Sequence, residues 1–220
     1  MYLVKPPGWL KWIYPGLIWD MHVEKDEKIL YLTFDDGPHP IATPFVLDQL
    51  KKYNAKATFF CIGRNVADHG DIYKRIIDEE HAIGNHTFNH LNGWKVRDQE
   101  YIADIVKAAE LIDSKMFRPP YGRITRFQSA VLRKESAHGK QPTTAHHQSF
   151  NIIMWSVLSG DWDNKIDGKK CYENVVLNAK NGGIIVFHDS AKALERMQFA
   201  LPKVLEYYTK EGFRFEAISK

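Results

Sequence analysis

The chain of 220 residues is short of cysteine, of uninterrupted apolar stretches and of runs of like charge. Its two cysteines, Cys61 and Cys171, provide no disulfide framework, and Cys61 stands in an apolar, strand-like run where we expect a small core residue. A formal net charge of +3 without a lysine or arginine cluster argues against a nucleic-acid surface. A hydrophobic fraction of 44% is sufficient for one large folded domain and argues against disorder.

The first twenty residues are apolar but broken. Proline, glycine and lysine interrupt them, and neither an uninterrupted hydrophobic region nor a small-residue cleavage site follows. The stretch is also too short and too broken to span a bilayer. The apolar residues are Trp9, Leu10, Trp12, Ile13, Tyr14, Leu17, Ile18 and Trp19.

Three interpretations of this stretch stay open: an extension packed on the domain, an interfacial anchor, or a poor signal segment. We expect residues 1–28 to form an N-terminal aromatic extension packed on the domain that follows. The sequence contains no clear signal peptide. We therefore expect a protein of the cytoplasm, or one associated with a membrane through peripheral contact of this stretch, with export left open.

From residue 29 onward, short apolar runs alternate with amphipathic stretches, which predicts a parallel α/β architecture. Seven strands are few for an eight-stranded barrel. The strand candidates are 29–34, 57–62, 82–84, 116–118, 152–157, 183–187 and 213–217. The helix candidates are 44–54, 65–80, 95–113, 125–135, 169–180 and 194–211.

Local signals suggest where two of these helices begin and end. Thr43-Pro44 is typical of an N-cap followed by a first-turn proline. Gly212 is typical of a C-terminal stop for the last helix.

Residues 136–149 break the alternation, because they are polar and contain glycine and proline. We expect an inserted surface loop, longer than most connections. His138, His146 and His147 suggest a second metal site as the alternative, but no carboxylate or cysteine accompanies them.

Asp35 and Asp36 follow the apolar run 29–34 and precede Gly37-Pro38. In isolation such a sequence is typical of a solvent-exposed turn. A buried strand that ended here would instead deliver both carboxylates to one rim of the sheet. Adjacent residues leaving a strand point in different directions, so the two carboxylates can have different roles.

His86 and His90 are four residues apart. On a helical turn this spacing puts both imidazoles on one face, where they can bind a divalent ion. Loop-prone asparagines surround them, so a pair of surface histidines near a turn is the alternative.

Two further polar motifs follow strand candidates. Arg118-Pro-Pro-Tyr121 is typical of a rigid turn, and His188 comes directly after Ile184–Phe187. A lone histidine at a strand end is more often structural. However, all these polar residues fall at the carboxyl ends of the predicted strands, which is where the active sites of α/β barrels lie.

Five segments together resemble the motifs of the polysaccharide deacetylase catalytic domain (NodB-like, carbohydrate esterase family 4), in the same order. The resemblance implies a distorted (β/α)7-type barrel with the active site at the carboxyl ends of the strands, and residues 29–220 as the NodB-like domain. The segments are TFDDGP at 33–38, HTFNH at 86–90, RPPY at 118–121, WSVLSGDW at 155–162 and IIVFHD at 184–189.

The resemblance also implies roles for individual residues. Asp35 is the general base, and Asp36, His86 and His90 bind one divalent metal ion, which leaves a position for water. Arg118 would pair with Asp35 and keep it ionised by lowering its pKa.

Further roles concern the leaving group and the substrate. Tyr121 would offer its backbone N–H to the developing oxyanion, and His188 would protonate the departing amine. Trp162 and Val186 match positions that line an acetyl-methyl pocket, with core packing as the alternative. Trp94 is a candidate for stacking on a sugar ring.

One position departs from the family pattern. An aspartate that usually supports the catalytic histidine is replaced by Leu158, three residues before Asp161-Trp162. Either His188 lacks a carboxylate partner, or Asp161 or Asp163 takes that place. Without a partner, we expect a lower pKa for His188 and a less available acid at neutral pH.

The resemblance implies a metal-dependent hydrolase that removes acetyl groups, most simply from the N-acetylglucosamine units of a polysaccharide or oligosaccharide. Zn²⁺ is the first expectation, and Co²⁺, Ni²⁺ and Mn²⁺ accept the same donors. A formamide, a cyclic amide or an O-acetyl sugar as substrate, or a catalytically silent carbohydrate-binding relative, are the alternatives. The expected partner is an acetylated carbohydrate, without nucleic acid, and no pattern specifies an oligomeric state.

Overall fold

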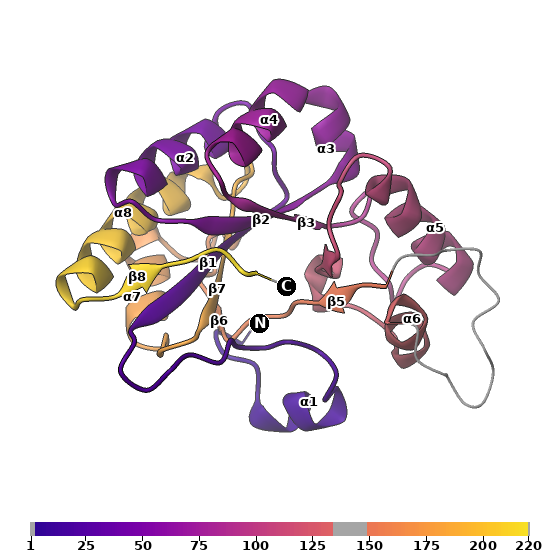
Figure 1. Cartoon of the computed structure of the whole chain (residues 1–220), viewed down its shortest axis with the longest axis horizontal. Helices are drawn as coiled ribbons and strands as arrows, with labels where there is room; N and C mark the ends of the chain where they lie inside the picture. The colour runs from indigo at the N-terminus through magenta and orange to yellow at the C-terminus, as the bar shows by residue number, and fades with distance from the viewer. Residues whose placement is uncertain (1–2, 134–148, 220) are drawn as a thin grey trace.

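The computed structural model describes residues 3–133 and 149–219, which form a curled sheet of parallel strands with helices on its outer side (Figure 1). The strand order is β5-β4-β3-β2-β1-β7-β6, and β8 pairs with β1 beside this path. The strands are β1 Ile29–Asp35, β2 Ala57–Cys61, β3 Ala82–Asn85, β4 Met116–Phe117, β5 Asn151–Ile152, β6 Val157–Leu158, β7 Ile184–His188 and β8 Arg214–Phe215. The architecture confirms the predicted α/β barrel of distorted (β/α)7 type.

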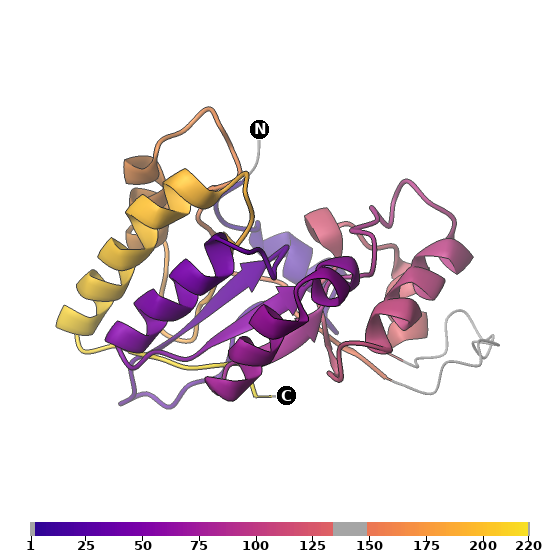
Figure 2. The same ribbon diagram turned by 90° about the horizontal axis from the view of Figure 1, so that it is seen from above.

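Helices cover the convex face of the sheet, and this arrangement is clear when the molecule is turned (Figure 2). Because both faces of the central strands are covered, all seven residues of β1 are buried. The helices are α1 Gly8–Ile13, α2 Ala42–Lys52, α3 Gly63–Asp68, α4 Gly70–Asp78, α5 Asp98–Ala109, α6 Arg126–Leu132, α7 Gly168–Val176 and α8 Leu194–Lys210, with a short 3₁₀ turn, η1, at Pro120–Gly122. Among the described residues, no helix is long and apolar enough to cross a membrane.

The core beneath the site is aromatic and aliphatic. Phe34 of β1 stacks on Phe59 of β2 and Phe187 of β7, with ring centroids 5.1 and 6.1 Å away. Cys61 is fully buried, as expected for a small core residue, and Cys171 is buried as well. This packing fixes the ends of the central strands, and so the positions of the polar residues that follow them.

Two predicted elements are wrong in extent. The strand predicted at 152–157 is two short strands, because its first half pairs with β4 and its second half with β7, at opposite ends of the strand order. The helix predicted at 65–80 is divided into α3 and α4 at His69, whose backbone is not helical (φ −134°, ψ 51°). In the first case a change of pairing partner interrupts a pattern that is locally continuous.

The prediction that Thr43 caps a helix is also wrong. Helix α2 begins at Ala42, and the ring Nδ1 of His39 accepts hydrogen bonds from the amides of Ile41 and Ala42 (3.2 and 3.1 Å). The hydroxyl of Thr43 instead donates to Asp189 Oδ2 (2.5 Å). The predicted helix stop is confirmed: Gly212 has a φ of 80° directly after α8, a conformation that glycine adopts without steric cost.

Residues 3–20 are called the N-terminal segment from here on. They lie against the stretch of chain that connects β5 to β6, and α1 is at the bottom of Figure 1. Leu17 and Trp19 are buried against the core that β4 and β5 contribute to. Residues 136–148 of the predicted inserted loop, with His138, His146 and His147, lie outside the described residues.

Candidate active site

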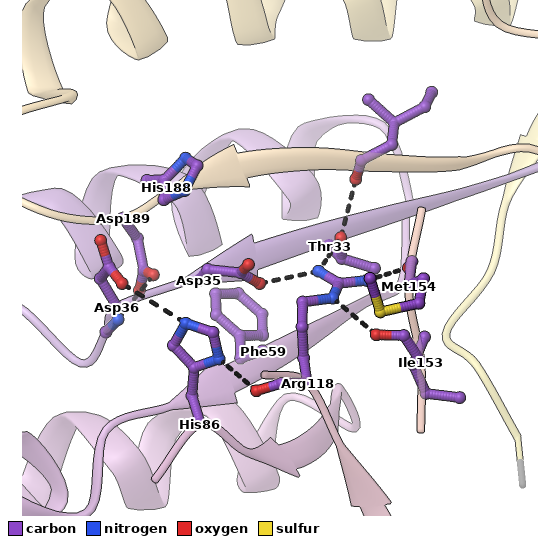
Figure 3. A network of polar contacts seen from close by, with 12 residues as sticks. Thr33, Asp35, Asp36, Phe59, His86, Arg118, Ile153, Met154, His188 and Asp189 are labelled. Atoms are coloured by element: carbon purple, nitrogen blue, oxygen red, sulfur yellow. Dashed lines mark hydrogen bonds and ion pairs between the residues drawn. The ribbon is translucent and has the colours of Figure 1, made fainter. Parts of the chain in front are cut away.

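Asp35 ends β1 and is held by a buried arginine (Figure 3). Nη1 of Arg118 donates to Asp35 Oδ1 and to Thr33 Oγ1, each at 2.7 Å. The remaining guanidinium donors bind the carbonyls of Ile153 (3.2 Å) and Met154 (2.9 Å). Arg118 is fully buried, so an unpaired charge here would be costly, and the four bonds fix the orientation of the carboxylate.

Asp36, His86 and His90 place one ligand atom each within 4.8 Å of one another. Asp36 Oδ1 lies 3.6 Å from His86 Nε2 and 3.1 Å from His90 Nε2, yet no described residue donates a hydrogen bond to this buried oxygen. Nδ1 of His86 lies 2.7 Å from the carbonyl of Arg118, which directs Nε2 toward Asp36 (Figure 3). An unsatisfied buried carboxylate oxygen between two imidazoles is suited to a cation.

The electrostatics of the triad agree with this assignment. Burial lowers the pKa of His86 to about 4, so its imidazole is neutral and available as a ligand. Burial alone would raise the pKa of Asp36, but His90, His188 and His86 hold that pKa below its usual value, so the carboxylate is ionised. Metals bind these deprotonated forms.

The spacing of the two histidines suggested a helical turn, but the structure does not place them on one. Residues 86–90 form an irregular loop in which Thr87 and His90 adopt left-handed backbone conformations (φ 66° and 58°). The carboxylate of Asp104 accepts hydrogen bonds from the amides of Phe88 and Asn89, both at 2.9 Å. Tertiary contacts therefore bring the imidazoles together, and helical periodicity does not.

Asp104 is one of several positioning residues that sequence reasoning missed. It stands on the buried face of α5, where a carboxylate among apolar residues was the available signal. Asn85 is fully buried and bonds the amide of Thr87 (2.8 Å) and the carbonyl of Ile105 (2.9 Å).

Asp189 was recognised only as part of a motif and was given no role. Its Oδ1 accepts the amide of Gly37 (3.0 Å), its Oδ2 accepts the hydroxyl of Thr43, and its own amide donates to the carbonyl of Asp35 (3.1 Å). Asp189 thereby fastens the turn that contains Asp36 to the end of β7.

His188 has a carboxylate partner in spite of Leu158. Nδ1 of His188 lies 2.8 Å from Asp161 Oδ1, and the other oxygen of Asp161 accepts the His188 backbone amide at 2.7 Å. Of the alternatives open from sequence, the structure places Asp161 in this position, while Asp163 accepts the amide of Lys165 instead. The alternative in which His188 lacks a carboxylate partner does not apply.

A lower pKa of His188 was predicted only for an imidazole without a partner, and the pairing with Asp161 gives the opposite direction. Burial lowers that pKa, but the charge and hydrogen bond of Asp161 outweigh burial and raise it to about 9. The imidazole is therefore protonated at neutral pH, as a general acid requires.

The metal triad, Asp35 and His188 line a cavity of about 670 Å³, and the remaining predicted site residues line it as well. Tyr121 has a φ of 60°, and its ring centroid lies 4.6 Å from that of His90. Trp162 lies edge-on to His188, with ring centroids 4.8 Å apart. Val186 is buried below them, and Trp94 lines the cavity with the Arg123 guanidinium over its ring.

Comparison with known proteins agrees with this geometry. The sequence profile of the family described as Polysaccharide deacetylase matches residues 22–141. A Bacillus cereus protein named peptidoglycan-N-acetylglucosamine deacetylase is 34% identical over 99% of this chain and 94% of its own. The Bacillus subtilis peptidoglycan-N-acetylmuramic acid deacetylase PdaA is 33% identical over 87% of this chain and 70% of its own.

A solved structure has the same fold over nearly the whole chain. The crystal structure of the Bc1960 peptidoglycan N-acetylglucosamine deacetylase, in complex with 4-naphthalen-1-yl-N-oxidanyl-benzamide, has a TM-score of 0.80 and 32% identity, and covers 97% of this chain and 95% of its own. The matched profile, the identity over nearly the full length and the shared fold lead to one conclusion: this chain belongs to the polysaccharide deacetylase family.

Proposed function

We propose that the protein is a metal-dependent deacetylase that hydrolyses the N-acetyl group of N-acetylglucosamine units in an acetylated glycan. The observation that carries this proposal is the meeting of three groups at one cavity: the Asp36–His86–His90 triad, the Asp35 carboxylate and the His188 imidazole paired with Asp161. The names of the relatives support peptidoglycan as the first glycan to test.

Asp36, His86 and His90 would hold the metal. One carboxylate oxygen and two imidazole nitrogens suit Zn²⁺, and Co²⁺, Ni²⁺ or Mn²⁺ accept the same donors. The orphaned Asp36 Oδ1 and the neutral His86 fit such an ion. A divalent ion bound there polarises the acetyl carbonyl and lowers the pKa of a bound water.

Asp35 is the proposed general base. Because Arg118 holds one of its oxygens with a charge-assisted bond, the carboxylate stays oriented toward the cavity while it accepts the proton of the attacking water. The peptide N–H of Tyr121 is the proposed donor to the oxyanion that forms on the acetyl oxygen. Hydrogen bonds of Gly122 and Arg123 to Pro119 and Pro120 hold that turn, and such preorganisation is what this stabilisation needs.

His188 is the proposed general acid. Its Nδ1 is bonded to Asp161, so Nε2 is the nitrogen left to give its proton to the departing amine. The carbon–nitrogen bond breaks, the acyl carbon keeps the oxygen of the water, and the products are acetate and a free amino sugar. Trp162, Val186 and Leu158 border the cavity as the proposed pocket for the acetyl methyl group.

Other acyl substrates would use the same groups. An O-acetyl sugar, a formamide or a cyclic amide requires the same attack on a carbonyl, so these classes belong in the test. Leu158 was the sequence feature that favoured a catalytically silent relative. Because Asp161 is the carboxylate partner of His188, Leu158 no longer argues against catalysis.

Acetate release from acetylated chito-oligosaccharides and from peptidoglycan fragments tests the proposal. Zinc-loaded or cobalt-loaded protein should release acetate and expose an equal number of amines. Asp35→Asn and a chelated sample should both lose this activity, while Asp163→Asn should retain it, because Asp163 accepts the amide of Lys165 and Asp161 is the partner of His188. One bound metal per chain without acetate release would redirect the search to the other acyl substrates, and no bound metal would overturn the mechanism.

A further inference from the structure

The N-terminal segment provides backbone partners for the chain between β5 and β6. The amide of Ile18 donates to the carbonyl of Ile152 (2.9 Å), and the carbonyl of Ile18 accepts the amide of Met154 (2.7 Å). Farther along, the amide of Leu158 donates to the carbonyl of Val4 (2.8 Å). Buried amides without partners are costly, so these bonds fix the segment against the site at two separate points.

The same segment forms an apolar wall of the cavity that contains the metal triad. With Met154, Trp155 and Leu158 it makes a surface of aliphatic and aromatic side chains beside the charged groups. The members from the N-terminal segment, which we call the N-terminal wall, are Leu3, Pro6, Pro7, Leu10, Tyr14, Leu17 and Trp19.

Helix α1 presents different residues to the cavity and to solvent. Leu10 is half-buried and lines the cavity, whereas Trp9 and Trp12 do not line it and are 61% and 84% exposed. Only one side of this short helix can therefore touch a ligand in the cavity.

We propose that the N-terminal wall binds the C–H face of the sugar ring next to the acetylated unit, and so gives the enzyme a preference for oligomeric glycans. This inference rests on the proposed deacetylase function. A glycan is polar at its acetamide and hydroxyl groups and apolar on the faces of its rings. The cavity has the same division, with the triad at one part and the apolar wall at another, and its 670 Å³ exceeds the needs of an acetyl group.

Two variants change the wall with little risk to the fold. Leu10→Gln replaces the apolar contact from α1 with a polar amide, and Leu3→Gln alters a residue that is 60% exposed and contributes little to the core. Trp12→Gln is the matched control, because it removes a large apolar side chain from the same helix outside the cavity. Thermal unfolding establishes that each variant is folded.

Binding is measured with the tetramer of N-acetylglucosamine and zinc-loaded Asp35→Asn protein, in which the ligand is not turned over. We expect Leu10→Gln to weaken tetramer binding by about five- to tenfold and Leu3→Gln by less, since a partial apolar contact is lost. Trp12→Gln should bind as tightly as the parent. In the active background, kcat/KM should fall more for the tetramer than for the shortest oligomer that is hydrolysed.

Unchanged tetramer binding in both wall variants would overturn the inference, as would an equal loss for Trp12→Gln. An equal fall of kcat/KM for short and long substrates would also overturn it, because the wall would then act on the acetylated unit itself. Failure of the deacetylase function has a different signature: wild-type protein would release no acetate, whatever the wall variants do to binding.

Discussion

Replacing Asp161 with asparagine should convert a pH-tolerant general acid into one that fails above neutrality. Asparagine keeps an oxygen that can accept the Nδ1–H of His188, but it removes the charge that raises the pKa of His188 to about 9. Burial, which lowers this pKa, is then opposed only by the smaller effects of the Asp36 and Asp35 charges, and the pKa should fall to about its ordinary 6.5. The lost stabilisation of the imidazolium corresponds to about 3 kcal/mol.

The consequence for activity depends on pH in a defined direction. The acid must be protonated, so activity is present below the pKa of His188 and is lost as pH rises through it. At pH 8 a group with a pKa of 9 is about nine-tenths protonated and one with a pKa of 6.5 about 3%, so kcat/KM should fall about 30-fold, against less than about twofold at pH 6. A bound cation lowers the pKa in both proteins, so the test is the displacement between the two profiles.

The assay is amine formation from an acetylated chito-oligosaccharide between pH 5.5 and 9 with zinc-saturated protein. Asp163→Asn is the matched control and should leave the profile unchanged, since Asp163 bonds the amide of Lys165. A loss in Asp161→Asn of the same size at every pH would refute the reasoning, because it would show that Asp161 acts only through geometry.

Four further predictions concern stability, metal binding and the surface of α1. Arg118→Ala leaves a buried carboxylate unpaired and should lower the free energy of unfolding by about 3–5 kcal/mol in urea denaturation of the metal-free protein; a loss below about 1 kcal/mol would contradict the buried pair. Asp104→Leu removes the hydrogen-bond acceptor of residues 86–90, called the histidine loop, and should weaken zinc binding at least about tenfold in a chelator competition. Little change in zinc binding would show that the loop keeps its shape without Asp104. Burial, with a smaller effect of a nearby lysine, lowers the pKa of His81 to about 4, so the unfolded chain binds a proton first as pH falls below 6.5. About 3 kcal/mol of stability should therefore be lost by pH 4, and His81→Leu should abolish this part of the slope. If α1 contacts membranes, Trp9→Ala with Trp12→Ala should reduce binding to anionic vesicles without affecting catalysis. Both tryptophans are exposed, so the buried Leu17 and Trp19 stay in place.

Much of the fold could be predicted because its signals are local. The runs that became β1, β2 and β7 are predominantly apolar, and such runs separated by amphipathic stretches have few alternatives to a parallel sheet. The stop at Gly212 depends on one residue with φ above zero, which glycine alone adopts freely. The cation-binding residue types were also visible, because carboxylates and histidines placed after strands have a restricted set of uses.

The arrangement of the site depended on contacts between distant segments, which no local pattern encodes. The split between β5 and β6 follows from a change of pairing partner along one extended stretch. The histidine loop is shaped by Asp104, fourteen or more residues away along the chain.

The same limit applies to the support of His188 and to the N-terminal segment. Spacing along the chain could show that Leu158 replaces an aspartate, but not whether Asp161 or Asp163 would reach the imidazole, because side-chain direction at a strand end is set by the path of the turn that follows. Apolar composition could suggest that the N-terminal segment packs somewhere, but only the folded chain places Leu10 in the wall of the cavity that the metal triad also lines. Composition and periodicity indicate which residues prefer burial, whereas long-range packing determines the partner of each buried group.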